Sequence, residues 1–388
     1  LIATTKRRRP PPRLRDYQQA ALDAWAAAGQ RGLVVLPTGA GKTRTAIAAI
    51  ARTGLSTLCI APTRVLLAQW RAALLAAGLG PVGQLGDGQR NLQHVTVATT
   101  ASARIHAARI GPRFALLVVD EAHHHAVSDE TLELYPAPAR LGLTATPPED
   151  PEPLARLEQL VGPVVYRIGV DELTGTFLST FDTVRWLLDL HPEARDAYAH
   201  DMARFRAVYA PWARANPSGR WQAFVAAAMR SEEGRKGLAA WRRARRRLAW
   251  PRCKSRAVGE LLQRHRSSRV LLFAADNTTA YALAREHLVA PITCDIPKAE
   301  RAELLQAFAD GRLRRLVSAR VLNEGLDVPD ADVAILCGGS QGSREYVQRV
   351  GRVLRPVEGK RALVIELAVR GTHEARQHER GRRRLASP

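Results

Sequence analysis

Residues 35–43, Val-Leu-Pro-Thr-Gly-Ala-Gly-Lys-Thr, join the end of a short apolar strand to a turn of small residues and the start of a helix. In such a turn the backbone N–H groups converge at the positive end of the helix dipole, which is where a polyphosphate binds. Lys42 is then expected to reach the β- and γ-phosphates, and the Thr43 hydroxyl to bind Mg²⁺. The residues expected to hold the phosphates are Pro37, Thr38, Gly39, Ala40, Gly41, Lys42 and Thr43.

The loop departs from the usual phosphate-loop pattern at Leu36, which occupies the position of the first glycine. Pro-Thr-Gly-x-Gly-Lys-Thr is a variant associated with one group of nucleotide-driven motors. A plain glycine-rich turn between a strand and a helix is the alternative, and the Gly-Lys-Thr ending with its flanks disfavours it. Upstream of the loop, the amide of Gln18 can donate and accept at once, which suits the N6/N7 edge of adenine.

Two adjacent carboxylates, Asp120 and Glu121, follow the apolar run of residues 115–119. Charges at the end of a buried strand are costly unless a cation engages them. A Mg²⁺ ion shared with the nucleotide is the natural cation, with Asp120 in its shell and Glu121 polarising the attacking water. A surface acidic pair is the alternative, which the apolar residues before it disfavour.

Short apolar runs alternate with helical stretches in the first half of the chain, which predicts a parallel sheet covered by helices on both faces. Ligands of such sheets bind at the carboxyl ends of the strands. Besides the loop and the carboxylate pair, the residues at expected strand ends are Pro62, Thr63, Arg64, Thr99, Thr100, Thr144 and Thr146.

Composition points to an anionic partner. The chain has 388 residues, enough for about two or three domains, and a formal net charge of +21. Codon bias in a GC-rich genome explains the preference for arginine over lysine, but not the excess of basic over acidic residues. Nucleic acid is therefore the favoured partner. The four cysteines lack paired spacing, and neither a membrane span nor a signal peptide is apparent, so we expect a soluble cytoplasmic protein with reduced thiols.

The middle of the chain, from about residue 175 to 250, breaks the alternating rhythm. A strand is expected over 181–190 and a helix over 191–211. Residues 238–248 predict a strongly basic helix that keeps an apolar stripe. Its basic face, including Arg242 and Arg246, suits a phosphate backbone, and an ordinary solvated arginine face is an equally weighted alternative.

The alternating rhythm returns from residue 267 and predicts a second α/β sheet that has no phosphate loop of its own. Its distinctive segment is 346–356, Tyr-Val-Gln-Arg-Val-Gly-Arg-Val-Leu-Arg-Pro. On a helical segment, Arg349, Arg352 and Arg355 share one face. Arginines brought from a second domain to a bound nucleotide would stabilise charge on the transferring phosphoryl group. The alternative is that these three arginines form one more arginine-rich surface and contact no nucleotide.

The ordered set of motifs resembles the superfamily 2 helicases. The matching segments are 14–18, 36–43, 61–64, 99–100, the Asp-Glu-Ala-His box at 120–123, Leu-Thr-Ala-Thr-Pro at 143–147, 323–329 and 348–356. Within the superfamily the chain looks most similar to the XPB-like repair helicases, with the type I and III restriction motors near them. RNA helicases of the Asp-Glu-Ala-His class usually carry large C-terminal domains, for which this chain has no space.

The resemblance implies an α/β fold of two RecA-like parallel-sheet domains in tandem with a helical insertion between them. The expected units are a basic flexible arm (1–13), an ATP-binding domain (14–170), a linker with a thumb-like insertion (171–255), a second RecA-like domain (256–370) and a basic, disordered tail (371–388). XPB-like proteins also have N-terminal damage-recognition elements, which lack a counterpart before Leu14. The sequence begins at Leu1, not Met, and a truncation before Leu1 is one explanation for the lack of these elements.

The resemblance also assigns roles in the second half. Arg352 and Arg355 are the implied arginine fingers, and Gln348 is expected near the γ-phosphate. Gly325 and Asp327 fall in a motif whose aspartate contacts the ribose. Arg15 and Gln18 belong to the implied ATP-binding set, with Mg²⁺ on Thr43 and Asp120.

The implied mechanism is ATP hydrolysis coupled to opening and closing of the two lobes on a nucleic acid strand. Backbone contacts are expected from Pro62, Thr63, Arg64, Thr99, Thr100, Arg242 and Arg246, and coupling between the sites from Thr144 and Thr146. An ATP-driven DNA helicase or translocase acting in repair is the first hypothesis. An RNA-dependent remodelling ATPase or a restriction-type translocase is the second, and a non-catalytic clamp is the third. We expect a monomer that binds DNA without sequence preference and has a nuclease or another repair protein as a partner.

Overall fold

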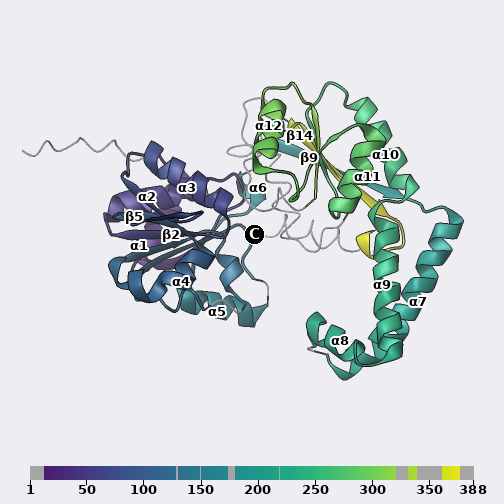
Figure 1. The fold of residues 1–388 in the computed structure, drawn as a ribbon, viewed down its shortest axis with the longest axis horizontal. Helices are drawn as coiled ribbons and strands as arrows, with labels where there is room; N and C mark the ends of the chain where they lie inside the picture. Colours follow the sequence, from purple (N-terminus) through teal and green to yellow (C-terminus); the bar gives the residue numbers. More distant parts are fainter. Residues whose placement is uncertain are drawn as a thin grey trace, which may run out of the picture.

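The structure, a computed structural model, describes residues 13–127, 130–148, 150–173, 180–217, 219–319, 331–338 and 361–375. These residues form two lobes, each built on a parallel sheet covered by helices, and a helical arm that extends away from the second lobe (Figure 1). The expected class of two parallel-sheet α/β domains in tandem is confirmed. The helical arm, expected between the domains, comes after β9, a strand of the second sheet.

The sheet of the first lobe has the strand order β4-β3-β5-β2-β6-β7-β1-β8, and only the β3–β4 pair is antiparallel. Its central strands are buried along their whole length, which is why their sequences are apolar rather than alternating. The bounds are β1 (Arg31–Val35), β2 (Thr57–Ala61), β3 (Val82–Gly86), β4 (Gln89–Asn91), β5 (Val95–Thr99), β6 (Leu116–Val119), β7 (Ala139–Thr144) and β8 (Val164–Arg167).

Helices cover both faces of this sheet. One buried cluster joins the sheet to α1, α2 and α3, and a second joins its other face to α4 and α5. The bounds are α1 (Asp16–Ala27), α2 (Lys42–Thr53), α3 (Arg64–Ala76), α4 (Thr100–Ile110) and α5 (Pro151–Val161), with short 3₁₀ turns η1 (Gly111–Arg113) and η2 (Ala122–His125). Because the strands are parallel, the loops after β1, β7, β6, β2 and β5 lie along one edge of the sheet.

The second sheet is entirely parallel, with the order β11-β12-β10-β13-β14-β9. Helices α10 and α11 pack on one face and α12 on the other. The bounds are β9 (Thr180–Leu188), β10 (Val270–Phe273), β11 (Ala290–Ile292), β12 (Arg315–Ser318), β13 (Val333–Leu336), β14 (Arg361–Val369), α10 (Arg252–Arg264), α11 (Asn277–His287) and α12 (Lys298–Ala309). A short helix, α6 (Val170–Leu173), precedes the strand β9.

Strand β9 precedes the arm in the sequence but belongs to the second sheet in space. The sequence predicts a strand there and groups it with the linker, whereas the structure pairs it with β14 from Thr180↔Arg361 to Leu188↔Val369, at the edge of the second sheet. The pairing joins segments about 180 residues apart, and local sequence patterns carry no information on such a partner. Beyond β9 the chain leaves the second lobe for the arm and returns to it at α10.

The arm consists of α7 (Pro192–Ala215), α8 (Trp221–Ala228) and α9 (Glu232–Ala249), with α7 packed along α9. Near its tip, the rings of Phe205, Phe224 and Trp241 belong to one aromatic cluster. Closer to the lobe, the buried Asp201 of α7 holds Arg243 at 2.8 Å and Arg247 at 3.3 Å. The arm is therefore a packed hairpin of helices with its own small core.

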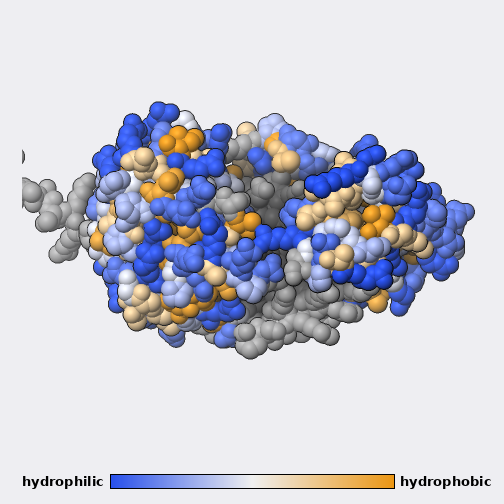
Figure 2. Space-filling view, turned by 90° about the horizontal axis from the view of Figure 1, so that it is seen from below, coloured by the Kyte–Doolittle hydropathy of each residue, from blue (hydrophilic) through white to orange (hydrophobic). Residues whose placement is uncertain are grey.

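The described surface is largely hydrophilic. Figure 2 shows hydrophobic residues in separate patches among hydrophilic ones on the face seen from below. No helix in the described ranges is both long and apolar enough to cross a membrane.

A buried ion pair joins the base of the arm to the end of the chain. The ammonium group of Lys254, which is fully buried, donates to Glu374 Oε1 at 2.7 Å and to the Leu248 carbonyl at 2.6 Å. Glu374 Oε2 in turn accepts from the Val369 amide at 3.2 Å. The expectation of a disordered tail from residue 371 is therefore wrong for residues 371–375, because the Glu374 carboxylate pairs with a lysine that would otherwise be buried alone. Residues 376–388 lie outside the described ranges.

Replacing this lysine tests the pair. Lys254→Met leaves the Glu374 carboxylate buried without its cation, which costs on the order of 3–5 kcal/mol, so we expect the thermal midpoint of the second lobe to fall by roughly 10 °C. Differential scanning calorimetry measures this. The control is Lys236→Met, which breaks an exposed pair with Glu232 and should move the midpoint by about 1 °C or less. An equal effect of the two substitutions would contradict the structural role of the pair.

Candidate active site

The phosphate loop connects β1 to α2. Gly39 and Gly41 have φ of 85° and 83°, in the left-handed region that favours glycine, and Gly41 caps α2 without any side-chain hydrogen bond to the helix. The first N–H groups of α2 are therefore left for a ligand. A methyl group at Gly41 would collide with the amide nitrogen of Gln18, so this position has no room for a side chain.

Leu36 is fully buried in the cluster beneath α1, α2 and α3. Its amide donates to the carbonyl of Thr144 at 3.0 Å, which extends the pairing of β1 with β7 by one residue. The side chain at this position contributes to the core, and a glycine there would leave a cavity. The departure from the usual loop pattern is thus explained by packing.

Helix α1 holds the loop from the side. The hydroxyl of Tyr17 and the side-chain amide of Gln18 both donate to the carbonyl of Ala40 at 2.8 Å. Gln18 also accepts from the Arg15 amide at 3.1 Å and is almost fully buried. In this arrangement the Gln18 amide fixes the loop, and its role in adenine binding stays a prediction, as does that of Arg15. Tyr17 was missed from the sequence, although its position beside Gln18 and ahead of a phosphate loop could have suggested it.

The carboxylate pair lies next to this loop because β6 is separated from β1 only by β7. Glu121 Oε1 is 3.8 Å from Lys42 Nζ, and Glu121 Oε2 is 3.5 Å from His123 Nδ1. Among the residues that the structure describes, none donates a hydrogen bond to Oε2. Glu121 has a φ of 46°, which is unusual for a residue with a side chain and costs about 1 kcal/mol or more. The strained backbone holds the carboxylate toward the lysine.

Asp120 is buried, and burial together with the charge of Glu121 raises its pKa to about 6. Two hydrogen-bond donors lower the pKa of Asp120: Trp70 Nε1 donates to Oδ2 at 2.8 Å, and the Glu121 amide donates to Oδ1 at 3.0 Å. Trp70 is another residue missed as part of the site, because its indole reaches Asp120 only through the packing of α3 on the sheet. A buried carboxylate of this kind, beside an acceptor without a partner and the uncapped end of α2, fits Mg²⁺ bound to a nucleotide phosphate.

Thr144 and Thr146, predicted to couple the sites, lie on the adjacent strand end. The Thr144 hydroxyl is 3.0 Å from His123 Nδ1 and accepts from the Thr146 amide at 3.1 Å. A chain of contacts therefore runs from Glu121 through His123 to the segment after β7. Their role in coupling stays a prediction.

The predicted phosphate contacts of a nucleic acid lie at the same edge of the sheet. Thr63 and Thr99 cap α3 and α4, accepting from the Leu66 amide at 3.3 Å and the Ser102 amide at 3.2 Å. Pro62 and Thr100 are partly exposed beside them, and Arg64 is mostly exposed, 3.6 Å from Asp87. On the arm, Arg242 and Arg246 are exposed, and neither has a hydrogen bond or ion pair to any described residue, whereas their neighbours Arg243 and Arg247 bind Asp201.

The residues predicted on the second lobe cannot be placed. Gly325, Asp327, Gln348, Arg352 and Arg355 all lie outside the described residues. The described site is accordingly the half contributed by the first lobe.

Comparisons with known proteins agree with this geometry. Residues 12–149 match the family model described as type III restriction enzyme, res subunit, and residues 253–357 match the helicase conserved C-terminal domain. The helicase domain of Hef from Pyrococcus furiosus superposes with a TM-score of 0.60 at 19% identity, covering 95% of this chain and 98% of that one, so the two share a fold. Matches to both a res-subunit model and a helicase C-terminal model define a superfamily 2 helicase.

Individual relatives identify the family within superfamily 2 to which the chain belongs. The chain is 34% identical to the DNA 3'-5' translocase XPB2 of Sulfurisphaera tokodaii, over 95% of this chain and 84% of that protein. It is 28% identical to the DNA 3'-5' helicase XPB of Mycobacterium tuberculosis, over 96% of this chain but only 64% of that protein. The chain therefore belongs to the XPB-like family of superfamily 2 ATP-dependent DNA helicases and translocases.

The contact of Trp70 with Asp120 gives a prediction with a pH signature. Trp70→Phe removes a donor that lowers the pKa of Asp120, so the carboxylate protonates at higher pH and competes less well for Mg²⁺. We expect the acid limb of the ATPase pH profile to move up by about one unit and the Mg²⁺ concentration for half-maximal activity to rise several-fold.

Trp25→Phe is the matched control, since Trp25 is equally buried in the same lobe but donates to the Arg140 carbonyl at 2.9 Å. It should lower stability while leaving the pH profile and the Mg²⁺ dependence in place. Equal shifts for both variants would mean that Trp70 acts only through packing.

Proposed function

We propose that this chain hydrolyses ATP·Mg²⁺ between its two lobes and uses the cycle to move along DNA in the 3'→5' direction during DNA repair. The proposal that the chain hydrolyses ATP rests on one observation: Lys42 lies 3.8 Å from Glu121, beside the buried Asp120 and the uncapped start of α2. The direction of movement is proposed from the names of the relatives, each called a 3'-5' enzyme.

In this proposal the residues of the first lobe have separate tasks. The loop amides and Lys42 bind the β- and γ-phosphates, while Thr43 and Asp120 hold the metal ion, which neutralises phosphate charge. Glu121 orients the water for attack on the γ-phosphate and accepts its proton. Arg352, Arg355 and Gln348 complete the site when the lobes close, and Gly325 and Asp327 contact the ribose.

The proposed units follow the motifs. The ATP-binding domain covers residues 14–170, the linker and thumb-like arm 171–255, and the second domain 256–370, with basic segments at 1–13 and 371–388. Strand β9 is the one element of the middle unit that pairs with the second sheet. We also propose that the chain works as a monomer in the cytoplasm and cooperates with a nuclease or another repair protein.

Glu121→Gln tests the hydrolytic assignment. The amide cannot accept a proton, so ATP turnover should fall about 100-fold or more, while a fluorescent ATP analogue should bind with little change in affinity. Steady-state ATPase assays and fluorescence titration measure the two quantities. Unchanged turnover would contradict the role given to Glu121.

The nature of the polymer is tested by measuring ATP turnover with single-stranded DNA, duplex DNA and RNA. We expect both DNA forms to stimulate turnover, and stimulation to weaken as salt rises, because the contacts are to phosphates. The RNA-dependent ATPase is the second candidate. Stimulation by RNA alone would favour it over the DNA motor.

The arm gives a further prediction. Removing both unpaired arginines, as Arg242→Ala/Arg246→Ala, should weaken DNA binding and reduce the slope of log K against log salt by about 1.4–1.8, the value for two phosphates. Fluorescence anisotropy at several salt concentrations measures both quantities. The matched control is Arg264→Ala/Arg266→Ala, which removes two exposed arginines at and just after the end of α10, before β10. If the two double variants behave alike, the basic face of α9 is only a solvated surface.

A further inference from the structure

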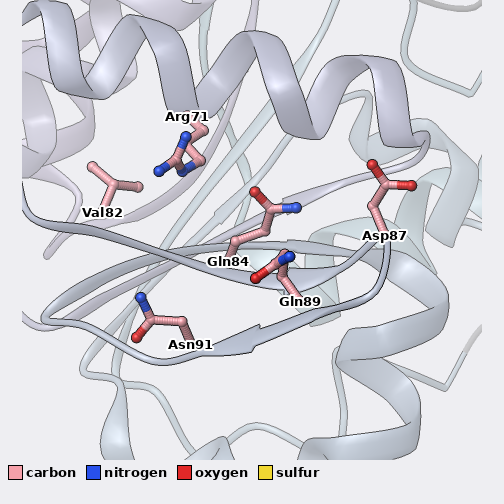
Figure 3. A pocket seen from close by; sticks show the side chains of 6 residues that line it. All are labelled: Arg71, Val82, Gln84, Asp87, Gln89 and Asn91. Atoms are coloured by element: carbon pink, nitrogen blue, oxygen red, sulfur yellow. The ribbon is translucent and has the colours of Figure 1, made fainter.

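A polar cavity of about 390 Å³ lies between α3 and the β3–β4 hairpin, within the roughly 300–1,000 Å³ range of ligand sites. Figure 3 shows Arg71 extending from α3 toward the hairpin, which carries the amide side chains on the other side. The lining residues are Arg71, Val82, Gln84, Asp87, Gln89 and Asn91.

The pattern of the hairpin explains why the cavity is polar. Gln84 pairs with Asn91, and Gly86 pairs with Gln89, so these residues share one face of the ribbon. A strand face covered by a helix is normally apolar. Here that face presents three amides, which supply both donors and acceptors. Such a surface binds a polar ligand better than it packs a helix.

The position of the cavity relates it to the DNA path. Arg71 follows Arg64 by two helical turns, so both project from the same side of α3, about 10 Å apart. Arg64 pairs with Asp87 at the hairpin turn. The backbone of Gly86 lies against the Thr99 hydroxyl, since a Cβ there would be 3.0 Å from it. The cavity therefore lies beside the predicted phosphate contacts, with Asp87 in contact with both.

Two lining groups are available to a ligand. Within the described ranges the Arg71 guanidinium has neither a carboxylate nor a carbonyl partner, and the Gln89 amide likewise makes no hydrogen bond. Gln84, by contrast, donates to the Gly86 carbonyl at 3.2 Å and so stabilises the turn. Arg71 and Gln89 thus combine an unpaired cation with an unpaired amide on opposite walls.

We propose that this cavity is a nucleotide-binding subsite that extends the DNA path beyond Arg64, with Arg71 binding a backbone phosphate and the Gln89 and Asn91 amides hydrogen-bonding the attached base or sugar. The inference rests on the proposed DNA motor. Asp87 opposes the bound strand, since its carboxylate pairs with Arg64 and repels phosphate. Nucleic acid binding therefore exchanges the exposed Arg64–Asp87 pair for a pair between Arg64 and phosphate.

The proposed subsite also lies close to Asp120, the carboxylate proposed to bind Mg²⁺. Trp70, next to Arg71 on α3, faces the sheet and donates to Asp120. A strand held by Arg71 therefore contacts the same helix turn that positions Asp120.

The test uses the full chain and a fluorescein-labelled dT20 strand in anisotropy titrations between 50 and 200 mM salt. Arg71→Ala should raise Kd by about 3- to 10-fold and reduce the salt slope by about 0.7, the value for one phosphate on a single strand. Gln89→Ala should raise Kd without changing the salt slope, because an amide displaces no counterion. Asp87→Asn should lower Kd and steepen the slope.

Arg109→Ala is the matched control for charge. Arg109 is exposed near the end of α4, on the opposite face and at the opposite edge of the same sheet. If Arg71→Ala and Arg109→Ala give the same Kd and slope while Arg64→Ala weakens binding, the subsite is wrong and the DNA path stops at Arg64. If the unmodified chain itself fails to bind DNA, the proposed function fails first. A Kd for Asp87→Asn equal to or above that of the unmodified chain would also overturn the role given to Asp87.

Discussion

The placement of a buried carboxylate beside the phosphate loop is the constraint on which the first lobe depends. Asp120 ends a strand that is buried along its whole length, and burial raises its pKa to about 6. An isolated charge there would be costly, so the surroundings supply the Trp70 indole, the Glu121 amide and the nearby Lys42. A Mg²⁺ ion bound with ATP, as proposed above, would complete this set. The strand order, the strained Glu121 backbone and the packing of α3 on the sheet bring these groups to Asp120.

Helix α3 contacts both the buried Asp120 carboxylate and the cavity proposed to bind DNA. One side of the helix carries Trp70, which donates to Asp120, and Arg64 and Arg71 lie along the β3–β4 hairpin. Because α3 packs on the sheet, we propose that a shift imposed on it by bound DNA would reach Asp120. The Glu121–His123–Thr144 contacts offer a second connection, toward the segment after β7.

Much of the fold was predictable because parallel strands buried on both faces have continuous apolar sequences. Strands β2, β5 and β13 are among the short, mostly apolar runs from which the two parallel sheets were predicted. The β3–β4 hairpin and α4 were not predicted, since β4 is exposed and polar and the residues of α4 have little amphipathic pattern. Helix α5 was also missed, although its residues are amphipathic. The arm was predicted as helical, but the division of its arginines into paired and unpaired ones needed Asp201 from α7. The edge position of β9 could not be predicted, because its partner lies about 180 residues away.

The sequence by itself determined the phosphate loop, the carboxylate pair and the family, because each depends on residue types at short, fixed spacing. Only the tertiary structure decided why Leu36 replaces glycine, that Gln18 and Tyr17 hold the loop through Ala40, and that Trp70 binds Asp120. Those roles depend on which side chains meet when helices pack on a sheet. Contacts of that kind join residues distant in the chain, and no local pattern encodes them.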